Sequence, residues 1–458
     1  MGLSEEQGTP LKKSLGLLGN LAITLSNITP ASSVFIIVPA LLVTTGTGIL
    51  WSFLIGLIIA LAIGLCDAEL GSLYPTAGGP YYVIKRVLGD YWGFIALSCI
   101  AVQAVVLTPA IAMGDGLYLH SFFPGISASV VGFIVMLASA VIAIFPISSN
   151  GYITGIFLVI ELLALILLSI IGFSHLHQSA SILISHPHAL VGGHLSTIGA
   201  GALIGGVVTA LFAYNGYDQV ITFGEETHGN PRYIGFAILA ALGVTVIFEV
   251  VPSVAVLLGA PDLTQLFSNS APVSYVIKAT TNDVWNAVIL IGILFAIFNA
   301  TIAIILGFAR MLYSSAREES WPPFINRALT HLHPKFKTPW IATLAIGVIG
   351  GLLCFASSFI LLITFTSVLV AVIYALIAVA ALITRVKGER SPFRMILWPL
   401  PPIVALVGII VALTQQTTKD LTITLIIFIV ASLYYVFYQR GRNKASKGEL
   451  AQTKINQN

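Results

Sequence analysis

Long apolar runs separated by short polar connections occupy almost the whole chain. A transmembrane helix needs about 20 mostly apolar residues, and twelve runs approach or exceed that length, which are numbered as spans 1 to 12 in chain order. Their expected bounds are residues 15–45, 47–71, 91–118, 126–147, 151–173, 199–224, 234–259, 284–314, 339–356, 358–384, 395–414 and 420–438. The pattern predicts an all-α integral membrane protein with twelve transmembrane helices.

Two of these spans carry polar, helix-breaking residues at their middle. Span 1 is interrupted at residues 26–33 (SNITPASS) and span 6 at residues 213–218 (AYNGYD). Lipid offers no partners for freed backbone groups, so a broken helix persists only where it lines a cavity. Interrupted spans at corresponding places in two halves of a chain point to the substrate site of a transporter.

The composition agrees with a chain that lies in a membrane. Mean hydropathy is +0.98, and only 9% of residues are charged, against roughly 25% in soluble domains. With the N-terminus inside, only Lys278 and Lys419 of the 21 Lys and Arg residues fall in outside loops. This bias predicts that both termini are cytoplasmic. The net charge of +3 reflects the same bias, and no basic, aromatic-interleaved surface indicates nucleic-acid binding.

The two interruptions divide the chain into two units of five spans. Residues 15–173 form the first and residues 199–384 the second, and an odd number of spans in each requires the second to be inverted in the bilayer. Residues 395–438 add spans 11 and 12. Residues 1–14 and 439–458 are expected to be cytoplasmic. The short tails favour an inner cell membrane as the location.

The cysteine residues suggest no metal centre or cross-link. Cys66, Cys99 and Cys354 lie in or beside apolar spans and are expected to be packing residues. None is extracellular, so no disulfide-linked subunit is expected. The loop 174–198 holds five of the nine histidines. We interpret it as a polar surface loop, with metal binding or pH sensing as alternatives.

The interruption of span 1 suits a zwitterion. Pro30 lacks an N–H group, and Ser32 and Ser33 can bond freed backbone groups. The half-helix that begins near Ser32 would direct N–H groups and its positive dipole end towards a carboxylate held at Ala31–Ser33. The preceding half would end near Asn27–Ile28 with free carbonyls for an ammonium group. The alternative is a simple proline kink.

In span 6, Gly216 permits unusual backbone dihedrals, and the carbonyls around Phe212–Asn215 can accept from an amine. Tyr214 and Tyr217 either line the pocket or pack against neighbours. Asp218 is an ionisable group within a span and therefore a candidate functional residue. It can pair with a substrate amine, carry a proton, or cap the second half-helix.

Two further carboxylates lie within spans. Glu161 is about ten residues into span 5, and we interpret it as a residue that takes up and releases a proton. The alternative is a structural hydrogen bond within the bundle. Glu249 in span 7 either contacts a basic group of the substrate or neutralises a partner. Because the fixed charges deep in the spans are acidic, a strongly acidic substrate is disfavoured.

Four stretches together resemble the amino acid–polyamine–organocation (APC) transporter superfamily along nearly the whole chain. They are residues 32–39 (SSVFIIVP), 69–81 (ELGSLYPTAGGPY), 212–232 (from FAYNGYD through GEE to NPR) and 310–339 (from R through ARE to KTP). The resemblance implies a LeuT-type fold of five plus five inverted helices with helices 1 and 6 broken, and two added helices.

The resemblance also implies roles for single residues. Phe212 stands where the family has an aromatic residue that covers the substrate. Glu161 resembles a substitute for the sodium ion that such transporters hold between spans 1, 5 and 8, and Asn299 and Thr301 can complete a polar cluster there. Departures at Ala31, Glu161 and Glu249 affect substrate and coupling, not the fold.

These observations predict a secondary active transporter of neutral or basic amino acids, driven by protons in preference to sodium and working by alternating access. An amine or polyamine carrier and an amino acid exchanger are the alternatives. A channel is disfavoured because no repeated filter motif is present. An enzyme is disfavoured because the chain has no nucleophile–base pair, metal cluster or phosphate loop. No cofactor is expected.

Overall fold

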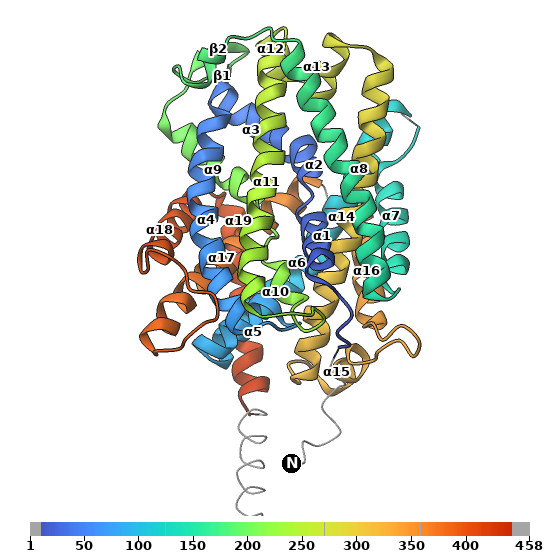
Figure 1. Ribbon diagram of the computed structural model, residues 1–458, viewed down its shortest axis with the longest axis vertical. Helices are drawn as coiled ribbons and strands as arrows, with labels where there is room; N and C mark the ends of the chain where they lie inside the picture. The colour runs from blue at the N-terminus through green and yellow to red at the C-terminus, as the bar shows by residue number, and fades with distance from the viewer. Residues whose placement is uncertain (1–10, 124, 270, 357–358, 442–458) are drawn as a thin grey trace, which may run out of the picture.

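The computed structural model describes residues 11–441 except 124, 270, 357 and 358. These residues form an elongated bundle of helices with a single two-stranded sheet in the described part of the chain (Figure 1). The predicted tail residues 1–10 and 442–458 lie outside the described residues. The bundle is almost entirely helical, which confirms the predicted all-α class.

The first half of the chain contains α1 (Leu17–Ile28), α2 (Pro30–Ser32), the π-helix η1 (Ser33–Ile37), α3 (Val38–Thr45), the 3-10 turn η2 (Gly46–Gly48), α4 (Ile49–Leu73), α5 (Gly79–Leu88), α6 (Asp90–Phe122), α7 (Ala128–Ala143) and α8 (Ile147–Ser174). The connection to the second half contains the 3-10 turn η3 (Ala180–Leu183) and the strands β1 (His188–Val191) and β2 (His194–Thr197).

The second half contains α9 (Ala200–Ala213), α10 (Gln219–Thr222), α11 (Arg232–Gly259), α12 (Leu263–Ser268), α13 (Pro272–Thr280), α14 (Asp283–Arg317), α15 (Pro323–Leu329), α16 (Trp340–Ala356), α17 (Phe359–Val386), α18 (Leu400–Thr414), α19 (Thr418–Tyr434) and the π-helix η4 (Tyr435–Gln439).

Seven helical stretches within the described residues are long and apolar enough to cross a membrane, and four shorter apolar helices accompany them. One of the seven, Leu17–Leu73, is 57 residues long and holds two of the predicted spans. The chain is therefore a multi-pass membrane protein. The count of twelve spans stays a prediction.

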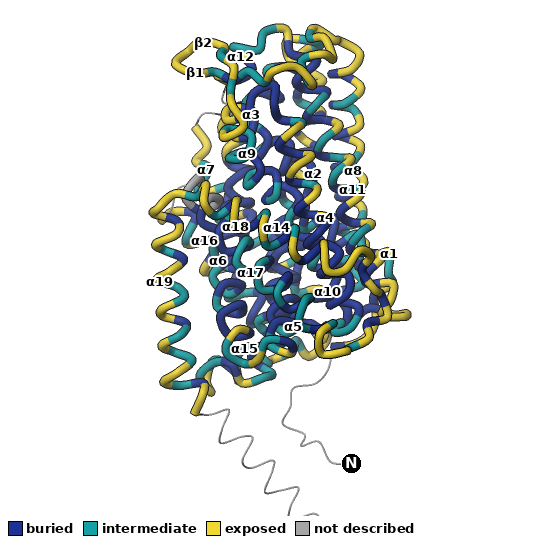
Figure 2. Tube along the Cα trace, turned by 90° about the vertical axis from the view of Figure 1, so that its left-hand side faces the viewer, coloured by how far each residue is buried: buried dark blue, intermediate teal, exposed yellow. Residues whose placement is uncertain are grey.

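The outer faces of the helices carry large apolar side chains. Leu425, Ile429 and Phe437 on α19 and η4 are exposed, and Figure 2 shows exposed residues along the outer helices around a buried centre. A helix that is apolar on all sides belongs in a protein core or in lipid. These faces are suited to contact with acyl chains.

Helices that are distant in sequence meet at the centre of the bundle. α1 packs against α8 and α14, and α9 packs against α3 and α4. The segment α2 packs against α8, α11 and α14, and α10 packs against α1, α4, α5, α11 and α14. The two predicted interruptions are therefore brought together by packing, not by sequence proximity.

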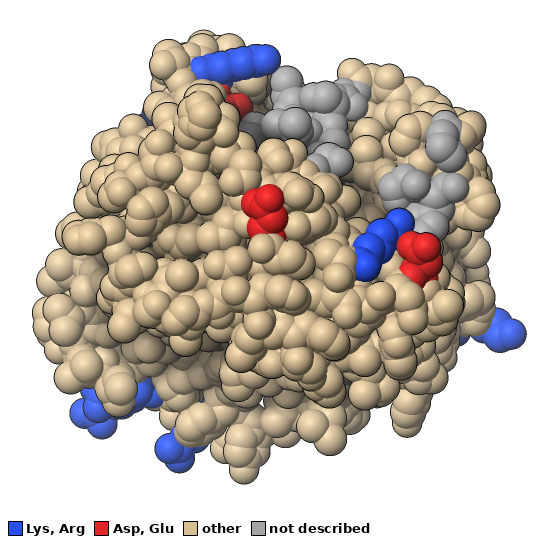
Figure 3. Space-filling view, turned by 90° about the horizontal axis from the view of Figure 1, so that it is seen from above, with Lys and Arg blue, Asp and Glu red and all other residues tan. Residues whose placement is uncertain are grey.

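The two ends of the bundle differ. Both described chain ends, α5 and α15 lie at one end, which we call the terminal end, and β1, β2, α12 and α13 lie at the other, the hairpin end (Figure 1). Viewed from above, the hairpin end is largely uncharged, with a few scattered charged side chains (Figure 3). Among the described residues, no three His, Cys, Asp or Glu side chains converge on a possible metal site.

At the terminal end, acidic residues after α10 pair with basic residues of α14. Glu225 accepts from Arg317 at 2.7 Å, and Glu226 forms an almost fully buried ion pair with Arg310. The amides of Ser14 and Leu15 donate to the carbonyl of Glu226 at 3.0 and 2.9 Å. Glu225 and Glu226 thus pair with the basic region that begins at Arg310, and the segment before α1 is bound to the same place.

Candidate substrate site

The helical path of span 1 is interrupted at a single residue. α1 ends at Ile28, Thr29 takes a left-handed conformation with φ of 51°, and α2 begins at Pro30. The first segment ends where the sequence predicted, but the second begins at Pro30, two residues before Ser32. Proline is suited to a first helical position because its φ is already helical and its missing N–H would be unbonded there.

The second interruption lies against the first. α9 ends at Ala213, and Gly216 has φ of 117°, which favours glycine. A Cβ atom at Gly216 would lie 2.7 Å from Nδ2 of Asn27 and 3.1 Å from Cγ1 of Ile28. Asn27 Nδ2 also lies 3.5 Å from the carbonyl oxygen of Gly216, at the limit of a hydrogen bond. The close approach of the two turns depends on the absence of a side chain at Gly216.

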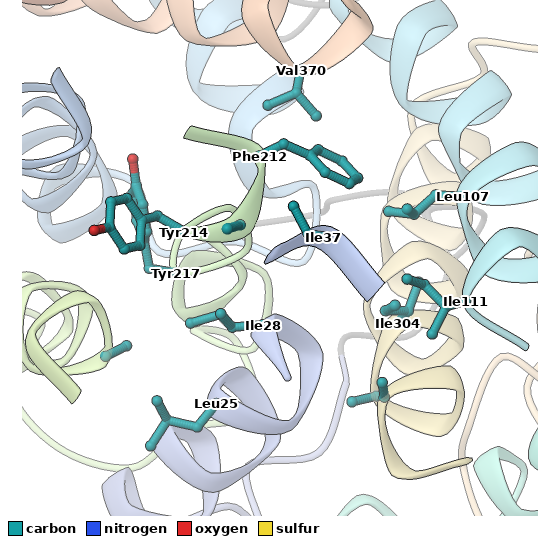
Figure 4. Close-up of a cluster of buried hydrophobic side chains, with 14 of the residues drawn as sticks. Leu25, Ile28, Ile37, Leu107, Ile111, Phe212, Tyr214, Tyr217, Ile304 and Val370 are labelled. Atoms are coloured by element: carbon teal, nitrogen blue, oxygen red, sulfur yellow. The ribbon is translucent and has the colours of Figure 1, made fainter. Parts of the chain in front are cut away.

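A small cavity of about 30 Å³, the first cavity, lies beside both interruptions. Its walls are Asn27, Ile28, Thr29, Ser32, Ser33, Ile36, Ile37, Leu107, Ile111, Phe212, Asn215 and Ile304. Figure 4 shows the Phe212 ring among Ile37, Leu107 and Val370. Five predicted binding residues are in this wall: Ile28, Ser32, Ser33, Phe212 and Asn215.

Tyr214 and Tyr217 do not line the first cavity. Their hydroxyls donate to the carbonyls of Phe53 at 3.2 Å and Ala60 at 3.3 Å, both on α4. In Figure 4 the two rings lie on the other side of the chain from Phe212. Of the two alternatives for these tyrosines, packing against a neighbouring helix describes their position.

Glu161 accepts a hydrogen bond from the amide of Ala31, an N–H group that the sequence analysis assigned to a substrate carboxylate. Its Oε1 accepts from the amide of Ala31 at 2.9 Å and lies 3.2 Å from Oγ1 of Thr29. Thr29 Oγ1 is in turn 2.8 Å from the hydroxyl of Ser32. Oε2 of Glu161 is buried and has no hydrogen-bond partner among the described residues. The amide of Ala31 is therefore engaged by the protein's own carboxylate.

Glu249 lies on α11, close to Ser33 and within electrostatic range of Glu161. The Ser33 hydroxyl donates to the carbonyl of Ala213 at 3.3 Å, and neither oxygen of Glu249 forms a well-aligned hydrogen bond among the described residues. Two buried carboxyl groups thus flank the segment that follows Pro30. The role of Glu249 stays open between substrate contact and charge balance.

Asn299 and Thr301, the two residues of α14 that were predicted to form a polar cluster, make different hydrogen bonds. Asn299 Nδ2 donates to Oγ of Ser26 at 2.8 Å and to the carbonyl of Thr154 at 3.2 Å, which joins α14, α1 and α8. Thr301 Oγ1 donates to Ile297 O at 2.9 Å, within its own helix. Asn299 therefore takes part in a polar cluster between helices, whereas the hydroxyl of Thr301 is engaged within α14.

Asp218 lies in the wall of a second cavity, which has a volume of about 50 Å³. This second cavity also reaches Pro80 of α5. It precedes α10 directly, but its side chain makes no capping hydrogen bond. The second cavity is lined by Asn27, Pro80, Ile100, Gln103, Leu107, Asn215, Gly216, Asp218, Gln219, Ile304, Phe308, Met311, Val370, Ile373 and Tyr374.

Sequence reasoning missed three buried polar residues near this cavity. Asp67 on α4 is fully buried, has no hydrogen-bond partner in the described part of the chain, and interacts electrostatically with Asp218. Gln103 and Gln219 line the cavity. A usable signal was present for Asp67, because an ionisable residue inside an apolar span is a functional candidate by default.

Comparisons with known proteins show which proteins this chain is similar to. The family model described as "Amino acid permease" matches residues 15–438. The chain is 28% identical over 457 residues to the serine/threonine exchanger SteT of Bacillus subtilis (strain 168), which covers 97% of this chain and 100% of SteT. It is 21% identical over 459 residues to the branched-chain amino acid permease BcaP of the same organism, with 95% of each chain covered.

The fold has a counterpart among solved structures. The crystal structure of MhsT in complex with L-phenylalanine superposes with a TM-score of 0.60 at 14% sequence identity, and the match covers 93% of this chain and 100% of that one. At this identity the likeness concerns the fold alone. It supports the LeuT-like architecture that the sequence predicted.

Proposed function

This chain belongs to the amino acid permease family, and from that premise we propose that it is a proton-coupled secondary transporter that moves amino acids by alternating access. Its relatives SteT and BcaP are named as an amino acid exchanger and an amino acid permease, and not as enzymes. The observation that carries the proposal is the meeting of Asn27 and Gly216, where two interrupted helical paths adjoin one cavity. A midplane site between two such paths is the common arrangement in secondary transporters.

The proposed membrane arrangement has twelve spans, with spans 1 and 6 interrupted. The terminal end is taken as cytoplasmic, because α5, the end of α14 and α15 carry basic residues there. The N-terminal residues 1–14 and the tail 439–458 are then cytoplasmic. The protein as a whole lies in the inner membrane of a cell. In this proposal, the ion pairs Glu225–Arg317 and Glu226–Arg310 hold the cytoplasmic side closed.

The first cavity is the proposed site for the backbone of the substrate. The carbonyls at the end of α1 and near Phe212 accept from the ammonium group, and Ser32 and Ser33 contact the carboxylate. Since Glu161 already engages the Ala31 amide, the substrate carboxylate is proposed to bind nearer Ser32 and Ser33. Phe212 covers the bound molecule.

Glu161 is the proposed coupling residue. One of its oxygens bonds to the turn between α1 and α2, and the other has no partner in the described chain. Gain or loss of a proton at this carboxyl group changes its attraction for the Ala31 amide, because a charged acceptor forms the stronger hydrogen bond. Protonation is thereby linked to the geometry of the substrate site.

Amino acid exchange is the second candidate, favoured by the name of the relative SteT, a serine/threonine exchanger. An exchanger uses the same site but needs no ion gradient. The two candidates differ in what drives accumulation.

The experiment is uptake into sodium-free proteoliposomes of labelled neutral and basic amino acids and of their decarboxylated amines, with and without an inward proton gradient. Accumulation of amino acids driven by the gradient, with amines excluded, is the expected result. Uptake that requires internal amino acid and ignores the gradient would identify an exchanger. Amines entering as well as amino acids would contradict a carboxylate site and favour a polyamine carrier.

A further inference from the structure

We propose that the second cavity receives the side chain of the substrate, and that Gln103 and Gln219 select neutral amino acids whose side chains both donate and accept hydrogen bonds. Serine, threonine, asparagine and glutamine have such side chains. The inference rests on the proposed function, because it requires an amino acid bound in the first cavity.

The two cavities adjoin each other. Asn27, Leu107, Asn215 and Ile304 contribute to the walls of both. The second cavity has a volume of about 50 Å³, and one water-sized group needs roughly 10–15 Å³ on this measure. A hydroxyl or carboxamide group with its adjoining carbon therefore fits the space. A molecule whose backbone lies at the interruptions can extend its side chain into the second cavity.

Two residues in the wall of the second cavity carry hydrogen-bonding groups without a partner. Gln103 and Gln219 are 5% and 6% exposed. Nε2 of Gln103 and Oε1 of Gln219 have no hydrogen-bond partner among the described residues. A buried polar atom without a partner costs about 1–3 kcal/mol, so a ligand that supplies the missing bonds is favoured.

The chemistry of these two groups restricts the ligand. A carboxamide presents a donor on one side and an acceptor on the other, so a partner for both glutamines must be able to accept and to donate. A hydroxyl or carboxamide does both. An aliphatic group does neither, and an ammonium group cannot accept from Gln103. A carboxylate cannot donate to Gln219, and it would face the carboxyl group of Asp218 in the same wall.

The neighbouring helix leaves space for one of the glutamines. A Cβ atom added at Gly307 on α14 would lie 2.2 Å from Oε1 of Gln219. Any larger residue at that position would force the Gln219 carboxamide to move. The absence of a side chain at Gly307 therefore allows Gln219 to adopt its position in the cavity wall.

Threonine and valine provide the sharpest test because they have nearly the same shape and differ in one hydroxyl. In proteoliposomes, kcat/KM for threonine is expected to exceed that for valine at least about tenfold, since a site built to bind a hydroxyl rejects an analogue that lacks it. In Gln103→Leu, threonine uptake is expected to fall and valine uptake to rise, so that the ratio drops about tenfold. The matched control is Gln415→Leu, which makes the same change at an exposed position and should preserve the wild-type ratio.

Gly307→Ala is the second variant, and it is used if Gln103→Leu does not fold. It leaves Gln103 unchanged, displaces Gln219, and is expected to lower the threonine-to-valine ratio in the same direction. Wild-type protein that transports valine as well as threonine would overturn the side-chain site while leaving the proposed function intact. Equal losses for both substrates in Gln103→Leu would also overturn it. Wild-type protein that transports no amino acid would refute the proposed function as well.

Discussion

The amide of Ala31 donates a hydrogen bond of 2.9 Å to Oε1 of Glu161, across 130 residues of sequence. This bond joins α8 to the turn at which α1 gives way to α2. Glu161 Oε1 also lies 3.2 Å from the hydroxyl of Thr29, the residue with the left-handed backbone. A single carboxyl group is therefore bound to both residues that flank Pro30.

Replacing Glu161 with Gln should separate transport from its driving force. The amide oxygen of Gln can still accept from Ala31, but the side chain no longer exchanges a proton. We expect Glu161→Gln to retain amino acid exchange and to lose accumulation driven by a proton gradient. The measurement is labelled uptake with and without the gradient. Asp283→Asn, at a side chain that is 88% exposed, is the control, and gradient-driven accumulation by Glu161→Gln would contradict the coupling role.

Tyr214 and Asn215 are adjacent in sequence but should differ in their effect on substrate affinity. Tyr214 donates to the carbonyl of Phe53, away from the cavities, whereas Asn215 lines both cavities and accepts from the hydroxyl of Tyr374 at 2.5 Å. Tyr214→Phe is expected to cost about 0.5–1.5 kcal/mol of stability with KM nearly unchanged. Asn215→Ala is expected to raise KM. A larger change in KM for Tyr214→Phe than for Asn215→Ala would contradict the side-chain directions described.

A side chain at Gly216 should disable the site. Its φ of 117° is strained for any other residue, and an added Cβ would lie 2.7 Å from Nδ2 of Asn27. We expect Gly216→Ala to lower substrate affinity and transport rate together, measured as uptake by purified protein in liposomes. Gly243→Ala is the matched control, because it lies within helix α11 and no atom lies within 4 Å of its added Cβ. Equal activity of the two variants would show that the turns need not approach closely.

The Glu226–Arg310 pair should contribute far more to stability than an exposed pair. Arg310 is 1% exposed in its side chain and Glu226 is 4% exposed, so removing the charge of Glu226 leaves a buried guanidinium uncompensated. Glu226→Gln is expected to cost roughly 3–5 kcal/mol. Asp283→Asn, which breaks the exposed pair with Lys278, should cost about 0–1 kcal/mol. Thermal unfolding in detergent compares them, and similar midpoints for the two variants would refute the ranking.

The phenol of Tyr74, just beyond the end of α4, should titrate at a raised pH. Burial, followed by the hydrogen bond that it donates to Glu389, raises the pKa of Tyr74 to about 12, against about 10 in an unfolded chain. The folded state therefore favours the neutral phenol. The resulting stabilisation is complete below about pH 10 and is lost as the pH rises through about 12. The difference in phenolate absorbance between wild type and Tyr74→Phe should appear near pH 12; a difference centred near pH 10 would contradict it.

The sequence by itself determined the membrane class, the positions of the interruptions and the acidic character of the interior. Apolar length and the helix-breaking effect of Pro30 and Gly216 are local properties, and local properties can be read from neighbouring residues.

Only the tertiary structure decided which way the side chains face. The spans are apolar on all sides, so they show no polar stripe from which a buried direction could be inferred. Tyr214 and Tyr217 turn towards α4 because α4 offers them backbone carbonyls. The Ala31 amide is engaged by Glu161 because α8 packs beside α2. Gln103 resembled any other polar residue in its span until the fold brought it to the cavity wall that also contains Gln219.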